Sequence, residues 1–432
     1  MAASHVARAL ARVRRDPLDG DFPIAGRVEQ LCRDCGHGWR ERLLSPLVTL
    51  RLFLLQVLHG NTSITHLRQL SGLDFAPGSY CEARGRMPLA VILDLIHAVK
   101  EWAGPHVQQQ LPDPMSPAPS GARVIVTDGS TFSTPDTPPL RGHFGLWPGA
   151  KAGVAYPMGK LLGLLDLASG MFVQMLGLPL LLCCHEMSQV VHLHPMLLAG
   201  DILLGDRAFC SFAHVALLNA RGVFACFHLH QHRSHDVRQR RQRWTKPRKP
   251  PAWMTPQQYA LLPAWVDVRL VHYAVDRPGF RTTHVTVATT LSDERLWPDA
   301  AVAELYGRRW EIETCFNHLK TTLGMNMLKC KSVDGALKEL AMYLLAYNLV
   351  RLAMLQAAAR QGVAVNRVSF IDALRWLACR MLGLSGVQEL IVNPDRHGRC
   401  QPRVIRGRLK AYDLLMCPRG ELKTCGKAGE NA

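Results

Sequence analysis

The sequence predicts a mixed α/β fold in which a helical N-terminal region precedes a sheet flanked by helices. Residues 1–115 consist largely of apolar runs with helical spacing. Two short apolar runs, at 122–128 and 202–206, each end in an aspartate, and residues 223–291 contain three further runs that alternate as strands. Helices and strands combined in this way favour an α/β architecture.

The chain carries a large surplus of positive charge. Its 432 residues contain 51 Lys and Arg against 34 Asp and Glu, which leaves a net charge of +17. A surplus this large indicates a polyanionic partner, with nucleic acid favoured over an anionic membrane surface. The Arg-rich N-terminus lacks the apolar segment of a signal peptide, so we expect a cytoplasmic protein with its 13 cysteines reduced.

Residues 1–115 are expected to form a small helical bundle. The apolar run at 43–58 predicts one helix, and the turn at 61–63 can cap a second. A basic turn that contains Arg84 and Arg86 lies before a further helix. Such a turn suits contacts with phosphate groups.

Two motifs raise the question of a metal such as zinc. Cys32 and Cys35, followed by His37, have a spacing that can supply half of a zinc site. No second paired cluster follows at a finger-like distance, so a pair of reduced thiols is favoured. The alternating histidines at 228–232 are more typical of one strand face than of a ligand set.

One segment is long enough to cross a membrane. It runs from Leu161 to Cys184, and Asp166 is its only charge. However, Ser169 and Gly170 divide it into two runs of strand length. We therefore expect a buried hairpin in preference to a membrane span.

The two aspartates at the ends of predicted strands are Asp128 and Asp206. A buried strand that ends in a carboxylate holds that group rigidly. Asp136 and Asp201 are local competitors, but the first lies in a turn rich in Pro, Ser and Thr and the second precedes its strand. Asp206 could also act simply as the cap of the next helix.

A basic stretch, which we expect to form a loop, lies between the predicted strands of residues 221–300. It includes Arg240, Arg241 and Arg243, close to a tryptophan. A solvated run of charges is the simpler explanation. The number of cations beside an aromatic residue nevertheless favours contacts with phosphate.

A predicted helix from Tyr306 to Leu323 carries a row of polar side chains along the border of its apolar stripe. At about 100° per residue, four of them fall within an arc of roughly 60°. An amphipathic helix with an ion pair between Arg309 and Glu313 would explain part of this pattern. An acid between two bases and a phenol also suits a group that must stay ionised beside a polyanion. The four residues are Tyr306, Arg309, Glu313 and Lys320.

The spacing of these four residues resembles the Y-R-E-K signature of a large group of bacterial insertion-sequence transposases. Other blocks are similar to the same family: the Y-C-x-A-R-x-R-x-P motif at 80–88, the block that begins at Asp128, and the G-D-R block at 205–212. The resemblance implies an RNase H-like core, a mixed sheet flanked by helices, with a β-rich insertion and an N-terminal helical domain.

The resemblance also implies that Asp128, Asp206 and Glu313 form an Asp-Asp-Glu triad. This triad would bind two Mg²⁺ ions, for which Mn²⁺ can substitute, and Asp128 would bridge them. Two such ions would activate a water and neutralise the leaving oxygen during phosphodiester cleavage. The implied contacts with DNA come from Tyr306, Arg309, Lys320, Arg207, Arg84, Arg86, Arg240, Arg241 and Arg243.

The implied function is that of a DNA transposase that cleaves at insertion-sequence ends and transfers the 3′-OH strand to target DNA. Its partner would be double-stranded DNA, bound by a homodimer near the nucleoid, with no membrane involved. An inactive or domesticated DNA-binding descendant is the alternative. The expected domains, with a proline-rich linker at 108–121, are an N-terminal helical DNA-binding domain at 1–115, a first part of the catalytic core at 116–220, the β-rich insertion at 221–300, a second part of the core at 301–395 and a basic tail at 396–432.

Overall fold

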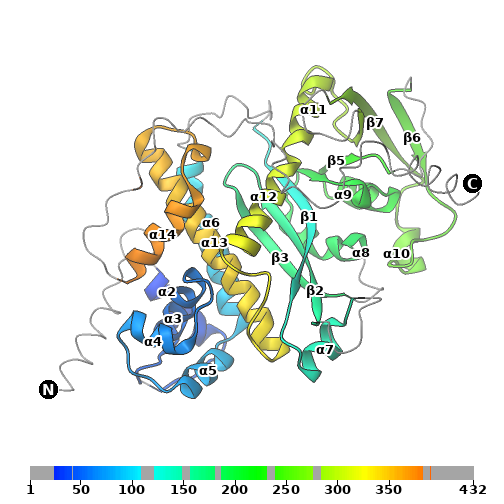
Figure 1. The fold of residues 1–432 in the computed structure, drawn as a ribbon. Coiled ribbons are helices and arrows are strands. Elements are labelled where there is room, and N and C mark those ends of the chain that lie inside the picture. Colours follow the sequence, from blue (N-terminus) through cyan, green and yellow to red (C-terminus); the bar gives the residue numbers. More distant parts are fainter. Residues whose placement is uncertain are drawn as a thin grey trace, which may run out of the picture.

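The computed structural model describes residues 24–40, 42–108, 121–147, 156–180, 186–230, 239–275, 284–382 and 390. The expected basic tail and most of the proline-rich linker lie outside these residues. Figure 1 shows a helical region on one side, the long helix α13 in the middle and the sheet on the other side.

The helical region confirms the predicted bundle. Pro46 occupies the first turn of α3, and Ser45 and Ser63 cap α3 and α4 through their hydroxyl groups. The turn between these two helices places Asn61 at φ 53°, a conformation that asparagine tolerates better than most residues. The helices of this region are α2 (Ile24–Asp34), α3 (Pro46–Leu58), α4 (Ile64–Ser71), α5 (Pro77–Arg86) and α6 (Leu89–Gln108).

The sheet has eight strands in the order β3-β2-β1-β4-β5-β8-β7-β6. Strands β1, β2 and β3 are antiparallel neighbours, whereas β1, β4 and β5 run parallel. This mixed sheet, flanked by helices, confirms the predicted RNase H-like fold class. The strands are β1 (Val124–Ser133), β2 (Met158–Asp166), β3 (Met171–Pro179), β4 (Ile202–Gly205), β5 (Phe224–His228), β6 (Arg241–Thr245), β7 (Trp265–Ala274) and β8 (His284–Thr289).

The shorter helices lie between and after these strands. Asp299–Gly307 forms α11, and Glu311–Asn317 forms α12, which packs beside β1. Three 3₁₀ turns, at 191–196, 207–209 and 365–367, connect further elements. The remaining helices are α7 (Pro138–Phe144), α8 (Glu186–Val190), α9 (Phe212–Ala220), α10 (Pro256–Ala260), α13 (Val333–Gln361) and α14 (Phe370–Met381).

The segment that could have crossed a membrane forms the β2–β3 hairpin, as predicted, up to Pro179, and its residues 181–184 lie outside the described residues. Its turn contains Gly170 at φ 64°, and its strands form one end of the sheet, with β3 at the edge. Among the described residues, α13 is long and apolar enough to span a membrane, but 94% of that stretch is buried within the protein. Helix α13 is therefore the central core helix of this fold.

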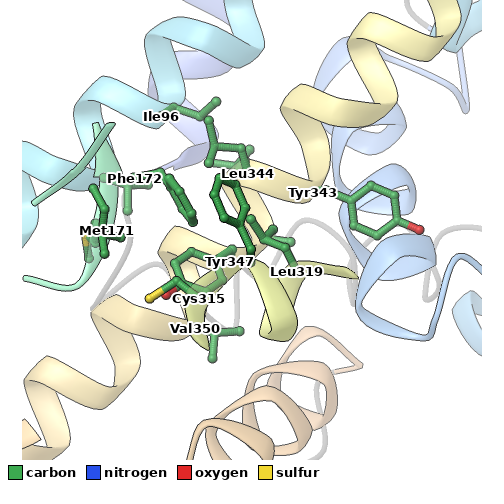
Figure 2. Packing of buried hydrophobic residues seen from close by; sticks show 14 of the residues in the cluster. Ile96, Met171, Phe172, Cys315, Leu319, Tyr343, Leu344, Tyr347 and Val350 are labelled. Atoms are coloured by element: carbon green, nitrogen blue, oxygen red, sulfur yellow. The ribbon is translucent and has the colours of Figure 1, made fainter. Parts of the chain in front are cut away.

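Helix α13 joins the helical region to the sheet. Figure 2 shows Ile96 of α6, Phe172 of β3 and Tyr347 of α13 in one apolar cluster. Polar side chains of α13 also bind the hairpin: the Tyr347 hydroxyl donates to Gly170 O at 3.0 Å, and Asn348 pairs with both backbone groups of Phe172. Arg351 completes this contact by donating to Ser169 O at 2.9 Å.

Two regions differ in detail from the sequence prediction. The expected continuous helix from Tyr306 to Leu323 is interrupted by a 3₁₀ turn at 308–310, and it ends in a π-helical turn at 318–322. The strands of the expected insertion extend the main sheet beyond β5. Part of the basic stretch, expected as a loop, forms the edge strand β6, because it pairs with β7 along five residues.

Candidate active site

Parallel strands bring Asp128 and Asp206 to the same end of the sheet. Strand β1 pairs with β4 from Val124 to Val126, and Asp206 directly follows β4. One Asp206 oxygen accepts the backbone N–H of Ala208 at 2.8 Å, so this residue does cap the following 3₁₀ turn. This cap uses only Oδ1 of the Asp206 carboxylate.

The competing acids have structural partners. Asp201, at the opposite end of β4, accepts hydrogen bonds from Arg123, including one at 2.9 Å from Nε. Asp136 accepts from Arg141 at 3.0 Å near the protein surface. Each of these acids is therefore held by an arginine away from the Asp128–Asp206 pair.

Arg309 connects two of the predicted triad residues. Its Nη1 lies 3.3 Å from Oδ2 of Asp128, and its Nη2 lies 3.3 Å from Oε1 of Glu313. The Arg309 side chain is 11% exposed and that of Asp128 is 16% exposed. Carboxylates from β1 and α12 thus share one largely buried guanidinium.

The electrostatic environment of Asp128 reflects this concentration of acids. Burial raises the pKa of its carboxyl group to about 6, and the neighbouring Asp206 and Glu313 raise it further. Two groups lower the pKa of Asp128: the Gly129 N–H, which donates to its carboxylate at 2.8 Å, and the Arg309 guanidinium. Burial lowers the pKa of Arg309, but Tyr306 and the three acids outweigh that effect and raise it.

Lys320 and Tyr306 also lie at this site. The Lys320 ammonium donates to the Ser130 hydroxyl at 3.2 Å. Ser130 is two residues after Asp128 on β1, so both side chains point to the same face of the sheet. Tyr306 is buried, and burial raises the pKa of its phenol. The polar row predicted on the sequence therefore borders the acids.

His228 is a residue at the site that the sequence prediction missed. It stands at the end of β5, beside β4, and its ring meets that of Tyr306 edge-on with centroids 6.2 Å apart. Nη2 of Arg207 lies 3.5 Å from its Nδ1. Burial, followed by Arg207 and Arg309, lowers the pKa of His228. The available signal in the sequence was its position near the end of the predicted strand at 223–229.

The donor set fits a hard divalent cation by its chemistry. Carboxylate oxygens are the protein ligands that Mg²⁺ prefers, and Arg309 occupies the place of a counter-ion between Asp128 and Glu313. Across the described residues, no three His, Cys, Asp or Glu side chains are already gathered at ligand distance. Cys32 and Cys35 are free thiols. His232, the last of the alternating histidines at 228–232, lies outside the residues that the structure describes.

Arg84, predicted from the sequence to bind DNA, points into the protein. Its guanidinium donates to Gln56 Oε1 at 3.0 Å and to Cys330 Sγ at 2.9 Å, and it lies 3.7 Å from the ring centre of Phe53. This set of contacts joins α5 to the segment that precedes α13. Arg86, two residues further on, is exposed and forms an ion pair with Glu82.

The predicted arginines of the basic stretch do not join the acid site. Strand β6 lies four positions from β4 in the sheet. Arg240 pairs with Asp299, Arg241 with Glu294, and Arg243 with Asp267. Charged side chains on an edge strand also discourage pairing with a second sheet, which is a structural role for these residues.

Comparison with known proteins identifies the family of the chain. A family model described as "Transposase DDE domain" matches residues 119–349, and this range includes Asp128, Asp206 and Glu313. The chain belongs to this family of DDE transposases.

Particular proteins are similar over shorter or more divergent stretches. Transposase InsG for insertion sequence element IS4, from Escherichia coli (strain K12), is 29% identical over 142 residues, which cover 29% of this chain. The match spans 32% of the length of that relative. The piggyBac transposase synaptic complex with hairpin DNA has a TM-score of 0.44 and 12% identity, covering 87% of this chain and 80% of that one.

Proposed function

We propose that this protein is a metal-dependent DNA transposase that cuts at the ends of an insertion sequence and joins the freed 3′-OH to target DNA. The observation that carries the proposal is the convergence of Asp128 and Glu313 on Arg309, with Asp206 on the adjacent parallel strand. Membership of the DDE transposase family supports the same activity.

Asp128, Asp206 and Glu313 would hold Mg²⁺, or Mn²⁺ in its place. When bound, these ions supply a nucleophilic water at neutral pH and neutralise the leaving oxygen. Arg309 balances two of the acids in their absence. Once the acids bind cations, its planar fork is available to hold two phosphate oxygens.

The neighbouring cations would position the DNA. Lys320, fixed by Ser130, stands near Asp128 and would contact the phosphate backbone. Arg207, directly after Asp206, and the exposed Arg86 are further candidates. We leave Arg84 out of this set because its guanidinium is already bound inside the protein. Two DNA ends must meet during transposition, so the active species would be a homodimer on double-stranded DNA in the bacterial cytoplasm.

Asp206→Asn provides a sharp test, because asparagine retains the capping oxygen but removes the charge. We expect this variant to lose cleavage of a supercoiled plasmid that carries the element ends, by at least about 10²-fold in Mg²⁺. Asp136→Asn makes the same chemical change at the competing acid and should cleave like the unmodified protein. Equal cleavage by Asp206→Asn would refute the proposed role.

The bridge formed by Arg309 also favours one alternative, a transposase-derived protein that binds DNA without cutting it. Such a protein would keep its acids neutralised internally by Arg309. It would retard the element ends in a gel but leave them intact with both Mg²⁺ and Mn²⁺. Nicked product with either ion rules out this alternative.

A further inference from the structure

A polar pocket lies in the helical region, apart from the acid site. It has a volume of about 760 Å³. One wall is a single face of α5, on which Ser79, Glu82 and Arg86 follow each other at helical spacing. The loop before α3 and the first turn of that helix form the other wall, where Arg40 and Arg42 lie.

Positive charge dominates this pocket. Arg40, Arg42 and Arg86 line it, whereas Glu82 is the acid among its described lining residues and already pairs with Arg86. The neighbouring His37 responds to this charge, since its pKa is lowered by burial and then by Arg86 and Lys338. The pocket therefore has the potential of an anion site.

The backbone adds to this preference. Helix α5 begins at the pocket, and no side chain caps its N-terminus at Ala76. Free N–H groups at a helix start attract anions. On the facing wall, the Thr49 hydroxyl oxygen is buried without a hydrogen-bond partner among the described residues. The uncapped N-terminus of α5 is thus available to a ligand, and the buried Thr49 hydroxyl lies behind the facing wall.

The floor of the pocket is apolar. Phe75 and Met87 are buried there, and Leu44 and Pro46 continue the same surface. A phosphate contact alone needs no such floor, whereas a planar base does. Pockets of roughly 300–1,000 Å³ are typical of small-molecule sites, so the volume suits one base with its sugar and phosphate.

We propose that this pocket binds a single unstacked nucleotide, with the base on the apolar floor and the phosphate at Arg40, Arg42 and Arg86. The nucleotide would come from DNA, which rests on the proposed function, or be a free mononucleotide of the same chemistry. The nucleotide would give Arg86 a second partner beside Glu82 and would add to the helical region a contact that depends on base unstacking.

The proposal can be tested with the full chain in EDTA, where no cleavage occurs. Fluorescence anisotropy would compare a paired duplex, the same duplex with one unpaired nucleotide, and a third in which that nucleotide lacks its base. We expect the second to bind about tenfold more tightly than the other two, as is typical of one base stacked in a protein site. The Arg40→Ala/Arg42→Ala variant should lose this preference.

Arg295→Ala, an exposed arginine outside the pocket, is the matched control and should keep the preference. The proposal is overturned if the Arg40→Ala/Arg42→Ala variant keeps the preference. It is also overturned if all three duplexes bind equally and the free nucleotide dAMP does not bind. Saturable dAMP binding that the double variant abolishes would instead identify a free nucleotide as the ligand. Plasmid cleavage is measured separately, so failure of the pocket proposal is distinguishable from failure of the transposase proposal.

Discussion

At the scale of single residues, Arg309 determines the state of the acid site. It pairs with both Asp128 and Glu313, from a position with only 11% of its side chain exposed. Asp128 nevertheless has a pKa of about 6, because its burial and the other two acids outweigh this one cation. The site is therefore strained electrostatically in the absence of metal, which is common where function and stability compete.

This imbalance predicts that Asp128→Asn stabilises the metal-free protein at pH 7. The folded-state pKa of Asp128 lies above its unfolded value. The carboxyl group therefore contributes to the stability of the folded state at low pH, and this contribution is lost as the pH rises through about 6. We expect a gain in unfolding free energy of roughly 1–3 kcal/mol at pH 7 that disappears below about pH 4.

Urea unfolding in EDTA at the two pH values measures this difference. A variant less stable than the unmodified protein at pH 7 would contradict the assigned environment of Asp128. Addition of Mg²⁺ should stabilise only the unmodified protein, since a ligand that binds the folded state raises its stability.

At the scale of elements, buried polar contacts connect the helical region to α13. Glu339 is fully buried and accepts hydrogen bonds from the Asn61 side chain at 2.5 Å and from the backbone N–H groups of Lys329 and Cys330. Arg84 reaches the same segment through Cys330. Through Arg84, the motif in α5 thus contacts the segment that precedes α13.

Glu339→Gln should therefore weaken this connection. An amide can accept at only one of its two polar atoms, so its NH₂ group would face backbone donors that the carboxylate satisfied. We expect a loss of roughly 2–4 kcal/mol in unfolding free energy, measured by urea unfolding. Glu304→Gln, on the exposed face of α11, is the control and should change little. Equal stability of the two variants would show that the buried contacts contribute little.

At the scale of the whole molecule, the positive charge is distributed over both the helical region and the sheet. The pocket of the helical region holds Arg40, Arg42 and Arg86, and the far edge of the sheet holds the arginines of β6. Arg241 and Arg243 of β6 both have acidic partners. The net charge of +17 is therefore a better guide to DNA binding than any single basic run.

The charge predicts that DNA binding depends steeply on salt. If six to ten phosphates are neutralised, affinity should fall about 10³- to 10⁵-fold between about 50 and 200 mM salt, because bound counterions are released from DNA. Anisotropy titrations with a paired duplex at several KCl concentrations measure the slope. An affinity that does not change with salt would contradict a binding mode based on phosphate contacts.

The sequence by itself determined much of this protein. Local apolar patterns predicted the helical region, the hairpin at 158–179 and the strands that end in Asp128 and Asp206, because these features depend on neighbours within one element. The family was predicted from the resemblance of the predicted helix from Tyr306 to Leu323 to the Y-R-E-K signature. The same patterns could not detect the turns that interrupt this helix, since irregular helical turns are set by packing.

Only the tertiary structure decided how distant residues are used. Arg84, assigned to DNA by its motif, faces Cys330, which lies 246 residues away in the chain. His228, which suggested at most a metal run, stands beside Tyr306 because β5 pairs with β4. Arg309 lies between Asp128 and Glu313 through the packing of α12 on β1. The partner of a side chain depends on which elements pack against each other in the folded core. The periodicity of one segment does not contain that information.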